Sequence, residues 1–338
     1  MKRWQTLAVG FAISGLFLFL AFRQADFEAI SQAFRTARYE YVAASFAAIL
    51  VTVLLRGLRW SILTQGRLTI MDAFWLFNIG FLFNNVLPAR LGEFARAGLA
   101  GRRPRMHFTS ALSSIVVERL FDMVSVVVLF ILVLLVLPLP GWATTAGAAM
   151  GAAALVGIVV LALAARRPEW ALDLGARLFG MLPRVDAETA RRFLEPFVNG
   201  LGGVSSVRTF ALGLGASVLA WLTSGFSAWL LMLAFWERAP LIAGQLSVAA
   251  AGLGIASPAA PSGVGPFEAA VIGVLTATGY DANIARSFAF ALHALNFVAT
   301  SVLGLLGLMR EGVSFGEVAR SAQSLRAGAG DPGADAQP

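Results

Sequence analysis

Residues 72–96 read DAFWLFNIGFLFNNVLPARLGEFAR, and this stretch decides how the chain folds. Its first part is apolar enough for a membrane helix, but three asparagines and Pro88 interrupt it. Proline removes a backbone donor, and unpaired backbone groups are not tolerated against lipid. We therefore expect residues 72–88 to form a re-entrant or broken helix that is shielded by protein or water.

The composition excludes a water-soluble fold. Charged residues make up 13% of the 338 residues and the apolar set 58%, whereas soluble domains carry about 25% charged residues. Cysteine is absent and only two histidines occur, so we expect no disulfide, no metal site and no cofactor. The net charge of +7 does not indicate a nucleic acid partner, because the arginines fall in short loops between apolar segments.

Apolar segment lengths predict a polytopic, all-α membrane protein. A helix needs about 20 apolar residues to cross the hydrocarbon core, and six segments reach that length. A second interrupted region, residues 240–280, holds two short apolar pieces split by SPAAPSGVGP. The six predicted spans are residues 4–22, 42–63, 111–137, 142–165, 209–236 and 283–309.

Arginine placement predicts the topology. If the N-terminus is cytoplasmic and both interrupted regions leave on the side they entered, loops 89–106 and 166–208 and the C-terminal tail are all cytoplasmic. This distribution follows the positive-inside rule and predicts a multi-pass protein of a bacterial inner membrane, with both termini in the cytoplasm. We expect linker 166–208 to form short amphipathic helices on the membrane surface, and tail 313–338 to be disordered.

The predicted transmembrane domain, residues 1–312, divides into two similar halves. Residues 1–137 and 142–309 each read helix, helix, broken hairpin, helix, and they start on opposite sides of the membrane. Such inverted repeats are common in secondary transporters, where the broken helices mark the substrate site. Chance similarity between two turns rich in glycine and proline is the alternative.

Charged residues at membrane depth are functional candidates because their burial is costly. Glu118 and Asp122 lie four residues apart on one helix face and repel each other. Arg119 reaches Asp122 but cannot neutralise both acids, so another cation is needed. The arginines predicted at a similar depth are Arg56, Arg59, Arg90 and Arg96. The group is either an ion-pair network that locks helices together or part of a gate for substrate.

Further candidates surround the two breaks. Arg56 and Arg59 share one helix face and either extend to anionic head groups or bind a lipid phosphate, for which guanidinium is suited. We expect Glu93 to pair with Arg96, and His293 to be a helix-packing residue rather than a proton relay. A purely structural elbow is the alternative at the first break. The candidate substrate-binding residues are Arg56, Arg59, Asn84, Asn85, Pro88, Arg90, Gly92, Glu93, Arg96, Glu118, Arg119, Asp122, Pro258, Pro261, Gly263, Gly265, Pro266 and Glu268.

Four segments carry a family resemblance. LLRGLRW, NNVLPARLGEFARA, VVERLFDM and SPAAPSGVGPFEAAV, in this order and spacing, resemble the lysylphosphatidylglycerol synthase transmembrane-domain family over roughly residues 5–312. In the bifunctional members this flippase-like domain is thought to move an aminoacylated phospholipid between leaflets, and a C-terminal soluble transferase domain makes that lipid. The sequence shows no counterpart of that domain up to Pro338, so we expect a stand-alone translocase without enzyme activity. Its cargo would be an anionic phospholipid or a polyprenyl- or hopanoid-type lipid.

Two other functions stay open from the sequence. One is a non-transporting scaffold for lipid or envelope-polymer enzymes, with a lipid-synthesis enzyme or a second copy of the chain as partner. The other is a membrane-embedded head-group transferase or hydrolase, but no H-E-x-x-H sequence and no cysteine is present. No Walker A sequence occurs, so protonation of a buried acid is the candidate energy source.

Overall fold

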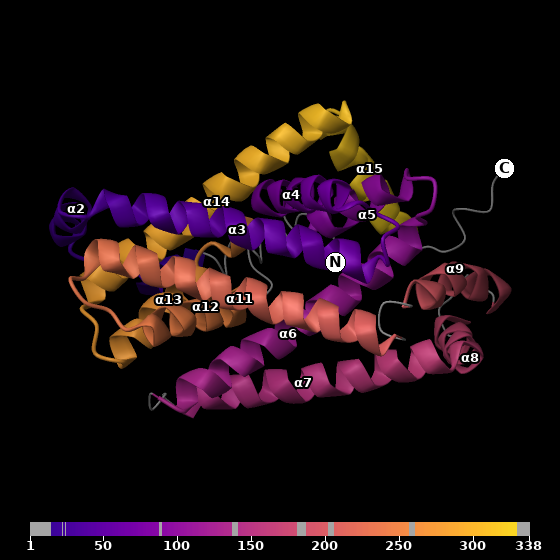
Figure 1. Ribbon diagram of the computed structural model, residues 1–338, viewed down its shortest axis with the longest axis horizontal. Helices are drawn as coiled ribbons and strands as arrows, with labels where there is room; N and C mark the ends of the chain where they lie inside the picture. Colours follow the sequence, from indigo (N-terminus) through magenta and orange to yellow (C-terminus); the bar gives the residue numbers. More distant parts are fainter. Residues whose placement is uncertain are drawn as a thin grey trace.

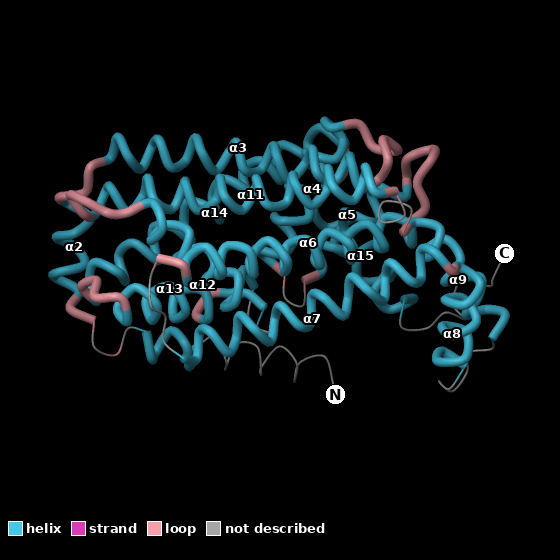
Figure 2. The backbone as a smooth tube through the Cα atoms, turned by 60° about the horizontal axis from the view of Figure 1, so that its bottom comes forward, coloured by secondary structure: helices cyan, strands magenta, loops and turns pink. Residues whose placement is uncertain are grey.

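The computed structural model describes residues 15–21, 23, 25–87, 90–136, 141–180, 187–201, 206–256 and 261–329. Regular structure within these ranges is entirely helical (Figure 2). The helices are α2 (Phe27–Arg35), α3 (Tyr39–Leu63), α4 (Ile70–Val86), α5 (Leu91–Gly101), α6 (Phe108–Leu134), α7 (Gly141–Arg166), α8 (Pro168–Gly180), α9 (Ala187–Gly200), α11 (Val207–Phe235), α12 (Leu241–Ala256), η1 (Pro261–Gly263), α13 (Pro266–Ala277), α14 (Ala282–Glu311) and α15 (Phe315–Ala329).

The predicted polytopic all-α membrane fold is confirmed. In the described part of the chain, α3, α7, α11 and α14 are long and apolar enough to cross a membrane. Helix α6 has 27 residues, which also suffices by length, but three charged residues lie near its middle. The first predicted span, 4–22, falls mostly outside the described residues, and its described part, 15–21, is helical.

Each interrupted region forms a helical hairpin that does not cross the bundle. In Figure 1, α4 starts at the end of the molecule where α8 and α9 lie, and α12 starts at the opposite end, near α2. Both hairpins, α4–α5 and α12–α13, turn back near the middle of the long axis. Their tips meet, because the Ser262 hydroxyl in η1 donates to Asn85 Oδ1 near the end of α4 at 3.4 Å. The two re-entrant hairpins therefore enter the bundle from opposite ends.

Close backbone contacts hold each hairpin together. A Cβ on Gly92 in α5 would lie 1.8 Å from the carbonyl oxygen of Gly80 in α4. In the second hairpin, a Cβ on Gly254 in α12 would lie 2.5 Å from the carbonyl oxygen of Pro266 in α13. Only a residue without a side chain fits at such a distance, so both hairpins depend on glycine where their two helices cross.

The arginine-rich segments lie at one end of the bundle, as the topology requires. Arg103, after α5, forms ion pairs with Asp72 at the start of α4 (3.2 Å) and with Glu311 at the end of α14 (2.8 Å). Ser110, at the start of α6, donates to the carbonyl oxygen of Pro196 in α9 at 2.9 Å. Loop 89–106, linker 166–208 and the end of α14 therefore share one end.

The expectation of a disordered tail is wrong for residues 315–329, which form α15. Phe315 stacks on Phe83 of α4 with ring centroids 4.5 Å apart, and Val318 and Ala322 are buried. These apolar residues recur every three or four positions, so they line one face of a helix. The surrounding small and polar residues concealed this face from composition alone. Residues 330–338 lie outside the described residues.

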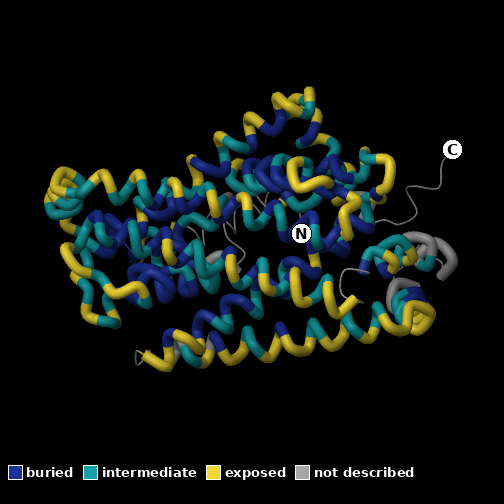
Figure 3. The backbone as a smooth tube through the Cα atoms, viewed as in Figure 1, coloured by how far each residue is buried: buried dark blue, intermediate teal, exposed yellow. Residues whose placement is uncertain are grey.

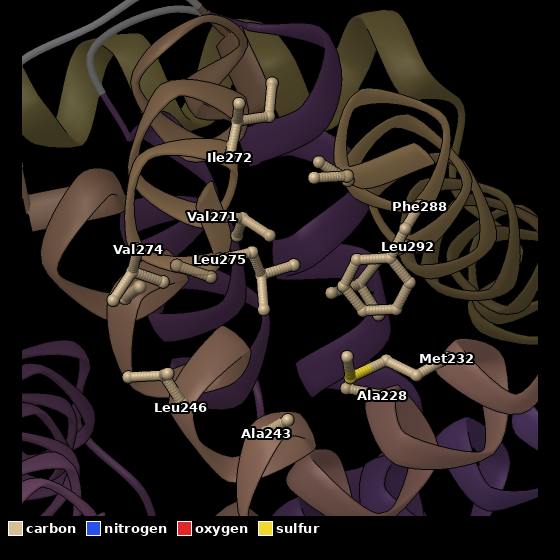
Figure 4. Close-up of a cluster of buried hydrophobic side chains, with 14 of the residues drawn as sticks. Ala228, Met232, Ala243, Leu246, Val271, Ile272, Val274, Leu275, Phe288 and Leu292 are labelled. Atoms are coloured by element: carbon tan, nitrogen blue, oxygen red, sulfur yellow. The ribbon is translucent and has the colours of Figure 1, made fainter. Parts of the chain in front are cut away.

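The short helix α13 is enclosed by apolar packing. Side chains such as Leu246 of α12, Val271 and Leu275 of α13, and Phe288 and Leu292 of α14 converge around it (Figure 4). By contrast, α7 is exposed along much of its length (Figure 3), where leucines and valines face outward toward lipid. A broken helix is tolerated at membrane depth when it is buried in protein, and α13 meets that condition.

Candidate functional site

Charged side chains from three helices meet inside the bundle around Glu118 of α6, which is fully buried. Its carboxylate lies 3.2 Å from Arg59 of α3, 2.8 Å from Arg96 of α5 and 3.2 Å from Arg119 of α6. Arg96 binds it in bidentate fashion, with nitrogen–oxygen distances of 2.8 and 3.2 Å. A buried carboxylate without partners would be strongly destabilising, and three guanidinium groups offset that cost.

Asp122 extends this arrangement by one turn of α6. It forms an ion pair with Arg59, lies 3.6 Å from Arg119, and accepts a hydrogen bond from Trp221 Nε1 on α11 at 2.9 Å. Arg59 also donates to the hydroxyl of Ser217 on α11 at 3.0 Å. The repulsion between the two acids requires a cation from outside the pair. Arg59 and Arg96, two of the four predicted candidates, provide it.

One predicted pair is wrong. Glu93 does not bind Arg96, and instead lies 3.3 Å from Arg119. Arg96 turns toward Glu118, with its guanidinium 4.8 Å from the ring centroid of Trp60 and 5.0 Å from that of Phe77. The reason is burial: the Glu93 side chain is 23% exposed and solvated, whereas Glu118 is sealed from water and needs the stronger bidentate partner.

Arg56 stands at the edge of this group. Its guanidinium lies 5.6 Å from the Trp221 ring centroid and 5.9 Å from that of Phe81. It makes no ion pair or hydrogen bond with the residues that the structure describes. We call the whole set the charge cluster; it comprises Arg56, Arg59, Glu93, Arg96, Glu118, Arg119 and Asp122. Four guanidinium groups face three carboxylates, so the charge cluster has one positive charge in excess.

The tip of the first hairpin is mainly a structural elbow. Asn84 Oδ1 accepts the backbone N–H of Gly92 at 2.9 Å, which closes α5 onto α4. Asn85 points away from the charge cluster and donates to the hydroxyls of Thr300 and Ser301 on α14, both at 3.0 Å. Arg90 begins α5 with a left-handed backbone (φ 53°) and an exposed side chain. Pro88 lies outside the described residues.

The tip of the second hairpin forms a separate polar group. Pro266 is the first residue of α13, and Glu268 caps the helix because its Oε2 accepts the Gly265 N–H at 2.7 Å. The φ angles of Gly263 (74°) and Gly265 (98°) favour glycine. Pro261 begins η1, and Pro258 lies outside the described residues.

Glu268 does not join the charge cluster but contacts His293 of α14, with 2.6 Å between Oε1 and Nδ1. The other ring nitrogen of His293 lies 2.9 Å from the Ser262 hydroxyl. The candidate residues thus fall into two groups, one at the charge cluster and one at the meeting point of the hairpin tips. Within the described residues no three histidine, aspartate or glutamate side chains converge as metal ligands.

Sequence reasoning missed three members of these groups. Trp221 and Ser217 lie on α11, about 100 residues from α6, and no spacing relates the two helices before they are folded. Ser262 was treated as part of a turn. His293 is buried and both of its ring nitrogens have polar partners, as a satisfied packing residue requires, and its choice over a proton relay stays a prediction.

Two opposed re-entrant hairpins and a buried charge cluster define a polytopic membrane protein with polar sites at membrane depth. The chain belongs to the family described as the lysylphosphatidylglycerol synthase TM region, whose model matches residues 7–304. It is also similar to a UPF0104 membrane protein of Methanothermobacter thermautotrophicus (strain Delta H). The two are 25% identical over 262 residues, which cover 74% of this chain and 77% of that protein. No solved structure matches the chain. The family resemblance of the four motifs is therefore confirmed.

Proposed function

We propose that this protein moves a phosphate-bearing lipid between the leaflets of a bacterial inner membrane, and that the open edge of the charge cluster binds the lipid head group. The observation that carries the proposal is Arg56. Without Arg56 the charge cluster is balanced, with three arginines and three carboxylates, so Arg56 is its excess positive charge, and no described residue forms an ion pair with it. A monoanionic phosphate would neutralise the cluster, and guanidinium suits phosphate oxygens.

The arginines of the charge cluster divide by accessibility. Arg59 and Arg96 are buried and form ion pairs with carboxylates, so they hold α3, α5 and α6 together. The Arg119 side chain is 36% exposed and Arg56 is half-buried, so neither is sealed inside the bundle as Arg59 is. We assign head-group binding to Arg56 and Arg119, with Trp221 beside them.

A neighbouring apolar surface supports a lipid rather than a soluble anion. Seven residues of α11, from Phe210 to Leu222, line an open and mostly apolar face of that helix. At one end, Phe210 packs edge-on against Phe121, the residue before Asp122, with ring centroids 5.1 Å apart. At the other end, Leu222 adjoins Trp221, which bonds to Asp122. An acyl chain lying along this face would place its head group beside the charge cluster.

The direction of entry follows from charge. The segments 89–106 and 166–208 carry five and seven arginines and lie at one end of the bundle, which we assign to the cytoplasm by the positive-inside rule. The first hairpin opens toward that end and the second toward the other. A head group would pass from the charge cluster along the meeting point of the two tips, which removes most of the cost of shedding water into hydrocarbon.

Leaflet transfer in reconstituted vesicles tests the proposal. Vesicles would carry fluorescent phosphatidylglycerol, phosphatidylcholine or an uncharged glycolipid, with dithionite quenching of the outer leaflet as the readout. We expect the wild type to transfer phosphatidylglycerol, Arg56→Gln to lose this transfer, and Arg208→Gln to retain it. Arg208 is an exposed arginine at the start of α11, away from the charge cluster, so it controls for loss of one positive charge. Normal transfer by Arg56→Gln would refute the assignment.

A second candidate function has one specific observation in its favour. Ser262, His293 and Glu268 are connected in the order of a nucleophile, a base and an orienting acid. Ser262 also has a left-handed backbone (φ 61°), which is strained for a residue other than glycine. A membrane-embedded ester hydrolase or transferase would use the Ser262 hydroxyl as nucleophile. A fluorophosphonate probe would then label the wild type but not Ser262→Ala, and absence of labelling would exclude this function.

A further inference from the structure

The contact between Glu268 and His293 is buried and specific. The Glu268 side chain is 4% exposed and that of His293 is 10% exposed. The ring of Phe267 stacks on the imidazole at 4.4 Å, and the second carboxylate oxygen is occupied by the Gly265 N–H. A glutamate and a histidine at membrane depth are a combination from which proton pathways are built.

Hydrogen-bond donors can be counted along this chain of groups. Asn85 uses its amide nitrogen to donate to α14, so its oxygen faces Ser262 as an acceptor. The Ser262 hydroxyl therefore donates to Asn85 and accepts from His293 Nε2–H. With Nε2 protonated, the contact of 2.6 Å between Nδ1 and Glu268 Oε1 requires a second proton, on the nitrogen or on the oxygen.

Removing that proton forces a different pattern. A neutral imidazole donates from Nδ1 to the Glu268 carboxylate, and Nε2 becomes an acceptor. The Ser262 hydroxyl then donates to His293 and no longer to Asn85. Because Ser262 belongs to the second hairpin and Asn85 to the first, the hydrogen bond between the tips exists only while the extra proton is bound.

Glu268 and His293 are the groups that can gain or lose a proton in this part of the structure. Helix α12 has no ionisable residue, and Glu268 is the only one in α13. On α14, Arg286 lies two turns from His293 and is bonded to the carbonyl oxygen of Ala21 and to Asn283. The acid of α4, Asp72, lies at the opposite end of that helix from Asn85, paired with Arg103.

We propose that Glu268 and His293 form a proton-binding site whose occupancy couples lipid movement to the proton gradient. Bound proton ties the two hairpin tips together through Ser262 and Asn85, and its release separates them. The coupling of lipid movement to the proton gradient rests on the proposed translocase function, but the existence of the proton-binding site does not.

Leaflet transfer under an imposed pH gradient tests the coupling. If one proton accompanies each lipid, a gradient of about one pH unit shifts the steady-state leaflet ratio by about tenfold. We expect this shift in the wild type and no shift in His293→Gln or Glu268→Gln. Asn296→Ala serves as the matched control and should keep it, because Asn296 lies on the same helix and its side-chain amide donates to the carbonyl oxygen of Leu292, one turn earlier.

The outcomes separate the two proposals. Transfer that is the same with and without the gradient in the wild type overturns the coupling and leaves the translocase intact. If no lipid is transferred at all, the proposed translocase function is overturned. The proton site must then be tested by a measurement that does not require transport. The chain has two histidines, so His107→Gln leaves the His293 ring as the single imidazole signal in ¹⁵N NMR. We expect that ring to lose a proton as pH rises, and an unchanged signal would overturn the proton site.

Discussion

Replacing Arg96 by methionine tests whether the charge cluster is structural where it is buried. The substitution keeps an apolar stem of similar length but leaves Glu118 with two guanidinium partners, Arg59 and Arg119, both at 3.2 Å. Breaking a buried ion pair costs about 3 to 5 kcal/mol, and the remaining partners place this case near the lower bound. Loss of the ring contacts with Trp60 and Phe77 adds about 1 kcal/mol. We expect a total loss of about 4 kcal/mol, close to a thousandfold change in the unfolding equilibrium.

Arg56→Met is the matched comparison. Arg56 has aromatic contacts but no direct ion pair with the described residues, so its replacement should cost about 0.5 to 1 kcal/mol. Unfolding by sodium dodecyl sulfate in mixed micelles, followed by tryptophan fluorescence, would measure both variants. The double variant Arg96→Met with Glu118→Gln should recover much of the loss, because the carboxylate left underpartnered is then neutral. If Arg96→Met is as stable as Arg56→Met, the division of the charge cluster into buried structural arginines and open binding arginines is wrong.

Three further predictions concern the fold. Gly92→Ala should destabilise the first hairpin by about 1 to 3 kcal/mol or more, since its methyl group would overlap the Gly80 carbonyl oxygen, and thermal unfolding would show this as a lower midpoint. Deleting residues 315–338 should lower the midpoint too, because the deletion exposes the apolar surface under α15; an unchanged midpoint would mean that α15 adds nothing to stability. In this cysteine-free chain, Arg105→Cys should react with an impermeant maleimide from the cytoplasmic side and Glu237→Cys from the other. Labelling of both from one side would contradict the opposed hairpins.

The sequence was sufficient for the fold because membrane physics leaves few options. Apolar length predicted the spanning helices, and the interruptions near Pro88 and Pro261 predicted hairpins, since broken backbone must be shielded. The helix α15 was missed because its apolar residues are spread among small ones. They can be recognised as one packing face only when the helix lies against α5. Composition reports how polar a segment is on average, and not which face meets a neighbour.

The sequence predicted which acids belong to the candidate site and that their partners would be arginines. The repulsion between Glu118 and Asp122 required an external cation, and helix spacing limited the choice to a few arginines. Which arginine meets which acid was not predictable, because burial decides it. The contacts of Trp221 and of His293 depend on how distant helices cross, which no local pattern encodes.

The attachment of α15 makes the two hairpins mechanically unequal. Phe315 of α15 stacks on Phe83 of the first hairpin, and Arg103, just after that hairpin, forms an ion pair with Glu311 at the end of α14. In the described part of the chain, no counterpart of α15 covers the second hairpin. The hairpin α4–α5 would then be held more firmly than α12–α13. We expect α12–α13 to account for most of any difference between inward-open and outward-open forms.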